Sequence, residues 1–256
     1  MAGRRPLVAG NWKMNPLDAA SAVALAQATA RAASSHAGVE VAVFPPFPWL
    51  REVARALEGT PVALGAQDCH WEESGAFTGE VSPAMLRGWC RWVIVGHSER
   101  RALGETDEIV SRKVAAALAA GLDVVVCVGE REAETREGRA AEVVAEQVRR
   151  ALSGCGSLDP ARLAVAYEPV WAIGTGKNAE PAQAGAAVAA VRGRIAEDLG
   201  EAVSAGVRVL YGGSVTSANV AAYVEVPGCG GCLVGGASLS AEEFGKMIAA
   251  VAAEGS

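Results

Sequence analysis

The sequence predicts an α/β protein in which eight parallel strands close into a barrel and helices cover the outside, the (β/α)8 fold. Short apolar runs alternate with longer, alanine-rich amphipathic segments eight times along the 256 residues. The apolar runs are continuous, as expected of strands that are covered on both faces. No Gly-x-Gly-x-x-Gly follows the first run, which argues against a dinucleotide-binding open sheet. No linker-like stretch interrupts the chain, so we expect one domain over residues 1–256.

The first half of the chain contains four strand–helix pairs that are delimited by breaker residues. Pro45-Pro46 ends the second apolar run, and Ser82-Pro83 opens a short helix because Ser is a good N-cap and Pro suits the first helical position. The loop between the third strand and that helix, Gln67–Val81, is unusually long for a compact domain. The expected strands are Pro6–Gly10, Val39–Phe44, Val62–Ala66 and Trp92–Val95, and the expected helices are Leu17–Ser35, Trp49–Leu57 and Thr106–Ala120.

The second half of the chain repeats the pattern. Gly121 follows the helix Thr106–Ala120 as a C-cap, because glycine readily adopts the left-handed conformation that ends a helix. The remaining strands are expected at Asp123–Val128, Leu163–Tyr167, Arg208–Tyr211 and Gly231–Val234, and the remaining helices at Arg139–Leu152, Pro181–Leu199, near Asn219–Tyr223 and at Ala241–Ala253. Functional side chains of such barrels lie at the carboxyl ends of the strands, so the residues after each strand are the candidates.

Composition and charge exclude several classes of protein. A hydrophobic content of 51% with 20% charged residues is typical of a folded globular chain. The net charge of −6 and the absence of a basic stripe argue against nucleic acid as a partner. No apolar run approaches the roughly 20 residues that span a bilayer, and Pro6–Gly10 is too short for the core of a signal peptide. We therefore expect no membrane partner and a cytoplasmic location.

The cysteines do not form the pattern of a disulfide framework. Six are scattered along the chain, and Cys127 and Cys232 lie in apolar runs where a thiol packs as a small hydrophobic group. The spacing Cys229-Gly-Gly-Cys232 allows redox or zinc chemistry. It lacks a second Cys pair and a nearby His, so we favour two incidental reduced thiols and expect no metal site.

One strand end carries a lone carboxylate followed by a segment that begins stiff and ends flexible. Glu168 directly follows the apolar run Leu163–Tyr167, and Pro169 then leads an apolar stretch that ends in Gly174 and Gly176. This order indicates a catalytic base beneath a closing lid. The alternative is an ordinary strand-to-helix loop with a solvated Glu.

Two further strand ends carry side chains that can stabilise negative charge. The first strand ends in Asn11 and Lys13, which point to the same side if the segment is extended. The fourth ends in His97, and if Ser98 begins a helical turn, the helix N-terminus lowers the pKa of the imidazole and favours a neutral, donating ring. The alternative interpretations are that Lys13 is an ordinary surface lysine and that His97 is a histidine packed in its loop. Glu99 is expected to support this site or to pair with Lys13, and not to react directly.

The last two strands end in paired glycines. Tyr211-Gly-Gly-Ser214 and Val234-Gly-Gly-Ala237 follow strands seven and eight, where barrels often bind phosphate through backbone N–H groups. A carboxylate, an imidazole, an ammonium group, an amide and a phosphate cradle suit proton abstraction next to a carbonyl on a small phosphorylated substrate. Glu168 takes the proton in this hypothesis, and His97, Asn11 and Lys13 stabilise the enediolate oxygens.

These segments resemble those of the triosephosphate isomerase family, whose fold is the TIM barrel. The similar motifs run from the first strand to the last: Ala9-Gly-Asn-Trp-Lys-Met-Asn15, Val95-Gly-His-Ser-Glu-Arg-Arg101, Ala166-Tyr-Glu-Pro-Val-Trp-Ala-Ile-Gly-Thr-Gly-Lys177, Tyr211-Gly-Gly-Ser-Val215 and Leu233-Val-Gly-Gly-Ala-Ser-Leu239. That family is the usual example of a Glu base, a neutral His and a closing lid, so the resemblance implies those roles and does not test them independently.

The resemblance implies interconversion of dihydroxyacetone phosphate and D-glyceraldehyde 3-phosphate, a step of glycolysis and gluconeogenesis, without cofactor or metal. It implies a catalytic set of Asn11, Lys13, His97 and Glu168, with Glu99 close by. It also implies that the substrate phosphate binds the main chain of Gly174, Ser214, Gly235 and Gly236.

The resemblance further implies a homodimer in which the loop 67–80 enters the active-site region of the second copy. Its tip, Gly75-Ala-Phe-Thr-Gly-Glu80, matches the family pattern, and Thr78 would brace Asn11 of the partner subunit. Two positions depart from the pattern. Asp68 stands where many members have Asn, which puts an extra charge near the interface, and Gly230 stands where the family often has Asp, which removes a cap of strand eight.

Two other functions compete with this hypothesis. A different isomerase or lyase can use a phosphate-binding barrel, since fold does not fix function, but it should lack the combination of Lys13, His97 and a lidded Glu168. A non-catalytic triose-phosphate sensor needs the glycine loops but has no use for the base. The presence of Glu168 therefore argues against the sensor.

Overall fold

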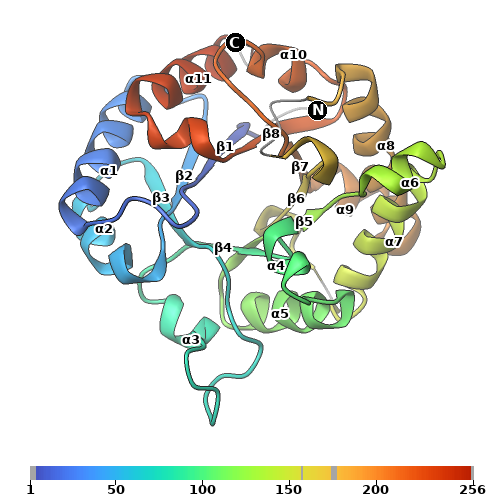
Figure 1. Ribbon diagram of the computed structural model, residues 1–256, viewed down its shortest axis with the longest axis horizontal. Helices are drawn as coiled ribbons and strands as arrows, with labels where there is room; N and C mark the ends of the chain where they lie inside the picture. Colours follow the sequence, from blue (N-terminus) through green and yellow to red (C-terminus); the bar gives the residue numbers. More distant parts are fainter. Residues whose placement is uncertain (1–3, 157, 174–177, 255–256) are drawn as a thin grey trace.

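Eight parallel strands form a closed barrel in the computed structural model, which describes residues 4–156, 158–173 and 178–254. Each strand pairs with its sequence neighbour, and β8 pairs with β1 to close the ring (Figure 1). The strands are β1 (Leu7–Asn11), β2 (Glu40–Phe44), β3 (Val62–Ala66), β4 (Trp92–Val95), β5 (Asp123–Val128), β6 (Leu163–Tyr167), β7 (Arg208–Tyr211) and β8 (Cys229–Val234). The predicted (β/α)8 barrel is confirmed.

Helices surround the barrel, and most follow the predicted segments within a few residues. The α-helices are α1 (Ala19–Ser34), α2 (Leu50–Ala56), α3 (Pro83–Leu86), α4 (Ser98–Ala102), α5 (Asp107–Ala119), α6 (Glu132–Arg136), α7 (Ala140–Leu152), α8 (Pro181–Leu199), α9 (Glu201–Gly206), α10 (Val220–Val224) and α11 (Ala241–Glu254). Short 3-10 helices are η1 (Phe47–Trp49), η2 (Pro160–Arg162), η3 (Val170–Ala172) and η4 (Gly236–Leu239). The sequence did not predict α6 or α9.

Local side-chain chemistry explains several of these helix limits. Asp18 caps α1 by accepting the Ser21 N–H at 2.8 Å, and Ser82 caps α3 by accepting the Met85 N–H at 3.3 Å. Gly121 has φ +93°, the positive value that ends α5 where other residues would be strained. The predicted roles of Ser82 and Gly121 agree with this geometry.

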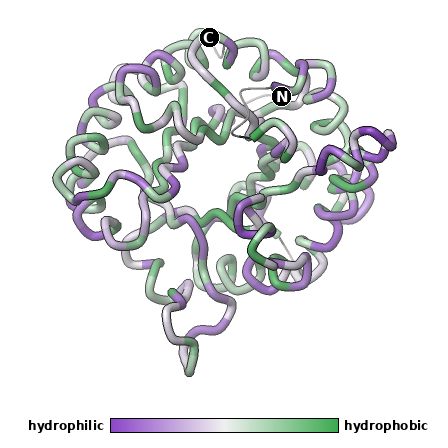
Figure 2. The backbone as a smooth tube through the Cα atoms, viewed as in Figure 1, coloured by the Kyte–Doolittle hydropathy of each residue, from purple (hydrophilic) through white to green (hydrophobic). Residues whose placement is uncertain are grey.

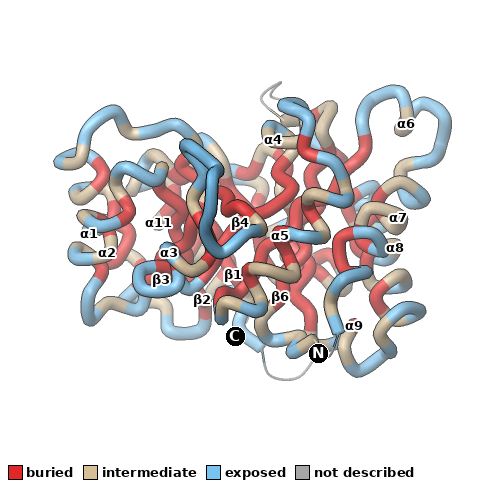
Figure 3. Tube along the Cα trace, turned by 90° about the horizontal axis from the view of Figure 1, so that it is seen from below, coloured by how far each residue is buried: buried red, intermediate tan, exposed pale blue. Residues whose placement is uncertain are grey.

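The core has two layers, one inside the barrel and one between the barrel and its helices. Apolar side chains such as Leu7, Phe44 and Trp92 fill the interior, and the strands form a mostly hydrophobic ring (Figure 2). Gly65 leaves room for Phe44, because a Cβ at Gly65 would lie 2.2 Å from the Phe44 ring. The second layer packs the helices on the strands, as in the buried band of Figure 3. The barrel interior is therefore a packed core of side chains.

The loops at the two ends of the barrel differ in length and exposure. In Figure 3, α4 and α6 follow strands and lie at the upper end, whereas α9 precedes β7 and lies at the lower end. The segment between β3 and α3 projects from the rim in Figure 1, and residues 72–80 of it are exposed. Among the residues that the structure describes, no helix is long and apolar enough to cross a membrane.

Candidate active site

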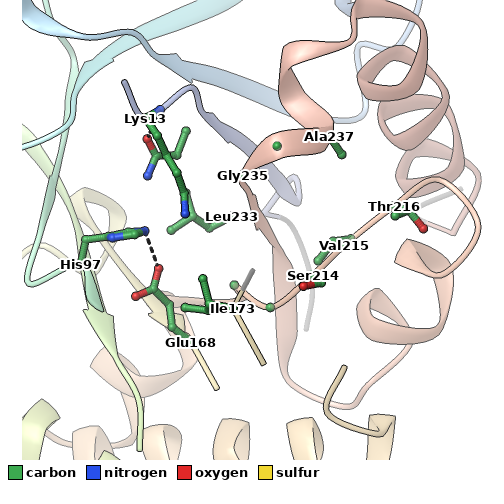
Figure 4. A pocket seen from close by; sticks show the side chains of 14 residues that line it. Lys13, His97, Glu168, Ile173, Ser214, Val215, Thr216, Leu233, Gly235 and Ala237 are labelled. Carbon is green, nitrogen blue, oxygen red and sulfur yellow. Dashed lines mark hydrogen bonds and ion pairs between the residues drawn. The ribbon is translucent and has the colours of Figure 1, made fainter. Parts of the chain in front are cut away.

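A cavity of about 410 Å³ lies at the carboxyl ends of the strands. The ends of β1, β4, β6, β7 and β8 contribute to it, so segments that are far apart in the sequence meet there (Figure 4). The cavity is lined by Asn11, Lys13, His97, Glu168, Ile173, Gly212, Gly213, Ser214, Val215, Thr216, Leu233, Gly235, Gly236 and Ala237. The structure thus brings together the predicted residues Asn11, Lys13, His97, Glu168, Ser214, Gly235 and Gly236. Gly174 lies outside the described residues.

Glu168 is a buried carboxylate with both oxygens occupied. Its side chain follows β6 and is only 2% exposed. Oε1 lies 3.0 Å from Nε2 of His97 (Figure 4). Oε2 accepts the Ser98 backbone N–H at 2.9 Å. Glu168 is therefore bound to the loop after β4, and is not the solvated loop residue of the alternative interpretation.

The hydrogen bonds of His97 determine which ring nitrogen carries the proton. His97 is the N-cap of α4, and its Nδ1 accepts the Glu99 backbone N–H at 3.2 Å. Because Nδ1 is an acceptor, the proton of the neutral ring is on Nε2, which then donates to Glu168. The donor of the neutral ring is therefore the nitrogen that faces Glu168.

The expected fall in the pKa of His97 is wrong for this conformation. Burial does lower the pKa of the imidazole, but the charge and hydrogen bond of Glu168 raise it by more, so the pKa lies above its ordinary value. For Glu168, burial raises the pKa, but His97 and then the Ser98 N–H lower it to below its ordinary value. The expectation from the sequence considered only the effect of the helix N-terminus on the pKa. It did not include the Glu168 carboxylate, which faces the ring in the folded protein.

Lys13 reaches the cavity by a different backbone path from the one expected. The segment after β1 is not extended, since Lys13 has φ +53°, a left-handed conformation that is uncommon for residues other than glycine. Asn11 Oδ1 accepts the Lys13 backbone N–H at 3.0 Å, which supports this turn. The ammonium group of Lys13 lies 2.5 Å from Glu99 Oε1, so Glu99 pairs with Lys13 and is not itself a lining residue.

Glycines let the backbone of the last two strand ends approach the cavity closely. A Cβ at Gly212 would lie 3.0 Å from the Glu168 side chain, and one at Gly235 would lie 3.4 Å from the Lys13 side chain. At Gly213 it would lie 2.2 Å from the Tyr211 hydroxyl. A side chain at residue 212 would therefore press on Glu168, and one at residue 213 would clash with Tyr211, whereas residue 235 leaves only contact distance to Lys13.

Sequence reasoning missed several residues of the site. Ile173 and Leu233 form an apolar part of its wall. Glu130 follows β5, and its Oε1 accepts hydrogen bonds from Trp171 Nε1 at 2.7 Å and from the Tyr167 hydroxyl at 3.2 Å. Glu130 thereby fixes the residues on both sides of Glu168. The strand-end rule applied to β5 would have found it.

The cysteine pair belongs to the wall of the barrel. Cys229 and Cys232 are buried on β8, and burial raises the pKa of the Cys229 thiol above its ordinary value. Within residues 4–156, 158–173 and 178–254, no group of three or more His, Cys, Asp or Glu side chains could hold a metal ion.

The pocket combines a buried carboxylate, an imidazole and an ammonium group at the end of the barrel where barrel enzymes carry their active sites, so fold and site define the class of barrel enzymes. The triosephosphate isomerase family model matches residues 6–251. Curated triosephosphate isomerases are similar over nearly their whole length. That of Caldanaerobacter subterraneus subsp. tengcongensis is 47% identical, with 96% of this chain and 99% of the relative covered. That of Symbiobacterium thermophilum is 49% identical, with 97% and 98% covered. The chain belongs to the triosephosphate isomerase family.

Asp68, which departs from the family pattern, is part of a buried ionic cluster. Its Oδ1 lies 2.7 Å from Lys113 Nζ, and its Oδ2 lies 3.0 Å from an Arg100 nitrogen. Lys113 also binds Glu105 at 3.0 Å. Burial raises the pKa of Asp68 above its ordinary value, although Lys113 opposes this. The extra charge is thus paired inside the protein and does not lie on an exposed surface.

The Glu168–His97 pair predicts a pH window for stability. The pKa of folded Glu168 is lowered, so its stabilisation is present above the unfolded value of 4.5 and is lost as pH falls through the folded pKa. The pKa of folded His97 is raised, so its stabilisation is present below 6.5 and is lost as pH rises through the folded pKa. The stability difference between wild type and Glu168→Gln should therefore be largest between pH 4.5 and 6.5.

Urea unfolding of both proteins from pH 4 to pH 9 measures this difference. Glu58→Gln, which changes an exposed Glu that makes no such contact, is the control and should show no such maximum. A difference that stays constant over the whole range would contradict the ion pair.

Proposed function

We propose that the chain is a single-domain isomerase that interconverts dihydroxyacetone phosphate and D-glyceraldehyde 3-phosphate. The observation that carries the proposal is the position of Glu168, a buried carboxylate that shares one cavity with His97 and Lys13. Glu168 is the base that takes a proton from the carbon next to the substrate carbonyl. Full-length similarity to triosephosphate isomerases supports this substrate.

The base must change partners before it can act. Both oxygens of Glu168 accept hydrogen bonds in the described structure, and these bonds stabilise the carboxylate and weaken it as a base. A substrate oxygen that takes over the Nε2–H of His97 releases Oε1. Glu168, still buried and now without that partner, has a higher pKa and removes the proton more readily.

The other lining residues stabilise the negative charge that forms on the substrate. Nε2–H of His97 donates to the enediolate oxygen, because Nδ1 is held by the Glu99 backbone N–H. Asn11 and the ammonium group of Lys13 lie in the same cavity and complete the stabilisation. The proton then returns from Glu168 to the neighbouring carbon, so the base is restored.

The glycine-rich ends of β7 and β8 bind the substrate phosphate through backbone N–H groups at Ser214, Gly235 and Gly236, with Gly174 from the lid. The lid begins at Val170–Ala172, whose Trp171 is held by Glu130. Exclusion of water by the lid protects the enediolate, which would otherwise lose phosphate.

A homodimer is the second part of the proposal. Several large apolar side chains are exposed in the isolated chain, and the proposed dimer would cover those that lie near the projecting loop and the site. They include Met14, Leu17, Phe77, Met85 and Leu103. Phe77 belongs to the projecting loop 67–80, and Met14 adjoins Lys13 in the site. The loop then enters the second copy so that Thr78 lies beside Asn11 of the partner subunit. We assign the enzyme to the cytoplasm.

Shortening the base tests the reaction. Glu168→Asp withdraws the carboxylate by one methylene group, so kcat should fall by about 100-fold or more with KM little changed. A coupled assay with D-glyceraldehyde 3-phosphate measures both constants. Glu58→Asp makes the same chemical change at an exposed site and should leave them unaltered. Equal activity of Glu168→Asp and wild type would refute the base.

A charge at the loop tip tests the dimer. Thr78 is exposed in the isolated chain, so Thr78→Arg should fold normally and weaken association, because it places a large cation in the proposed interface. Sedimentation measures the dimer fraction, and Glu73→Arg, also exposed but nearer the loop base, is the comparison. A wild type that is monomeric at micromolar concentration would contradict the proposed dimer.

A further inference from the structure

A second pocket, of about 310 Å³, lies at the opposite end of the barrel from the candidate active site. Its lining includes residues that precede or begin strands: Arg4, Arg5, Arg208 and Gly230, together with Arg192 of α8. This is the lower end in Figure 3, where α9 lies. The lining contains several guanidinium groups and one acidic residue, Glu254. The pocket is therefore positively charged, although the protein carries a net charge of −6.

Arg4 and Arg5 are held by backbone oxygens. Arg4 donates to the carbonyls of Pro160 at 2.9 Å, Gly206 at 2.6 Å and Ala161. Arg5 donates to the Ala37 carbonyl at 3.0 Å, which leaves other N–H groups of its guanidinium group available. Among the residues that the structure describes, neither forms an ion pair with a carboxylate. Carbonyl oxygens orient these cations, and the carboxylates of Glu40 and Asp123 act on Arg4 through their charge without pairing with it.

Arg208 adds a third positive charge beneath the pocket. It is 3% exposed and stacks 5.0 Å from the Trp92 ring, with Nη1 2.7 Å from Glu40. Glu40 also pairs with Arg91 at 3.2 Å, so two cations share this carboxylate. Nε and Nη2 of Arg208 have no hydrogen-bond partner in the described structure. Arg208 is enclosed and therefore acts through its field.

The local charge is unbalanced even when the ion pairs around the pocket are included. Asp123 pairs with Arg91 at 2.9 Å and with Arg162 at 3.3 Å, so it too is shared by two cations. Without Arg192, five guanidinium groups (Arg4, Arg5, Arg91, Arg162 and Arg208) accompany three carboxylates (Glu40, Asp123 and Glu254). The excess is two positive charges. Burial and then the charge of Arg208 lower the pKa of Arg4, as expected of crowded cations.

Gly230 packs closely against Arg208 at the edge of the pocket. A Cβ at Gly230 would lie 3.3 Å from Arg208 Cγ and 3.4 Å from its Cβ. The φ of Gly230 is not positive, so other residues can adopt its backbone conformation. A side chain at residue 230 would therefore press on Arg208, which has to shift slightly, and would lie beside the pocket; any residue placed there exerts this pressure, so a comparison of two variants of equal volume isolates the effect of charge.

We propose that this pocket binds a phosphate group, either as free inorganic phosphate or as part of a small ester. The excess of two positive charges matches a phosphate dianion, and guanidinium groups bind its oxygens with paired N–H donors. Arg5 and Arg4 make the direct contacts at the mouth of the pocket, and Arg208 strengthens the field. The site is separate from the cavity that holds Glu168 and does not depend on the isomerase reaction.

A matched pair of variants tests the proposal. Gly230→Asp places a carboxylate beside Arg208 and neutralises part of the excess charge, whereas Gly230→Asn adds nearly the same volume without charge. Equilibrium dialysis with labelled inorganic phosphate counts the phosphate bound per chain. Wild type and Gly230→Asn should bind one equivalent more than Gly230→Asp. Because the result is a difference between proteins, it holds whether or not the active site also binds phosphate.

Controls separate this site from the proposed enzyme activity. All three proteins should have the same isomerase kcat and KM and similar thermal unfolding, since residue 230 is far from Glu168. Competition with unlabelled glycerol 3-phosphate then distinguishes the two ligands. If it displaces the additional equivalent, the pocket binds phosphate esters, and if it does not, the pocket binds free phosphate. The same number of bound phosphates in all three proteins, or an equal loss in both variants, would overturn the proposal.

Discussion

The contact between Glu168 and His97 is the interaction on which the candidate site depends. It joins the end of β6 to the end of β4, and the Ser98 backbone N–H adds a second bond from the same loop. The barrel makes this contact possible, because its closure brings strand ends 70 residues apart in the chain to one rim. The contact makes Glu168 a weaker base, because it stabilises the ionised form of the carboxyl group. It also keeps a buried carboxylate paired until a substrate replaces it.

The positively charged side chains at the two ends of the barrel have different partners. At the carboxyl end, the cation Lys13 is paired with Glu99 and glycines leave room for an anion. At the other end, Arg4 and Arg5 are oriented by carbonyl oxygens, and neither forms an ion pair with a carboxylate in the described part of the chain. Both arrangements occur in a protein of net charge −6, so the two proposed anion sites depend on the local placement of charge and not on the overall field.

The barrel could be predicted because its strands are continuous apolar runs bounded by Pro, Gly and polar residues. Most lining residues could be predicted because the functional residues of barrels lie at strand ends. The sequence did not predict the left-handed backbone of Lys13, since residue spacing alone does not reveal a local turn. The predicted direction of the His97 pKa shift was wrong, because tertiary folding brings Glu168 against the ring and the sequence alone does not show this contact. Glu130 was missed although it also follows a strand, and the short helix α9 begins after Gly200 without a side-chain cap.

The central claim is that Glu168 is a weak, fully ionised base until a substrate displaces it from His97. The most direct measurement is the pKa of the Glu168 carboxyl group, followed by carbon-13 NMR with and without saturating glycerol 3-phosphate, a phosphate ester that lacks a carbonyl and cannot react. Without the ester, the pKa should lie below the ordinary value of 4.5. With the ester bound, it should rise, because an oxygen of the ester takes over the Nε2–H of His97 and Glu168 stays buried without that partner. The same low pKa in both states would contradict the account.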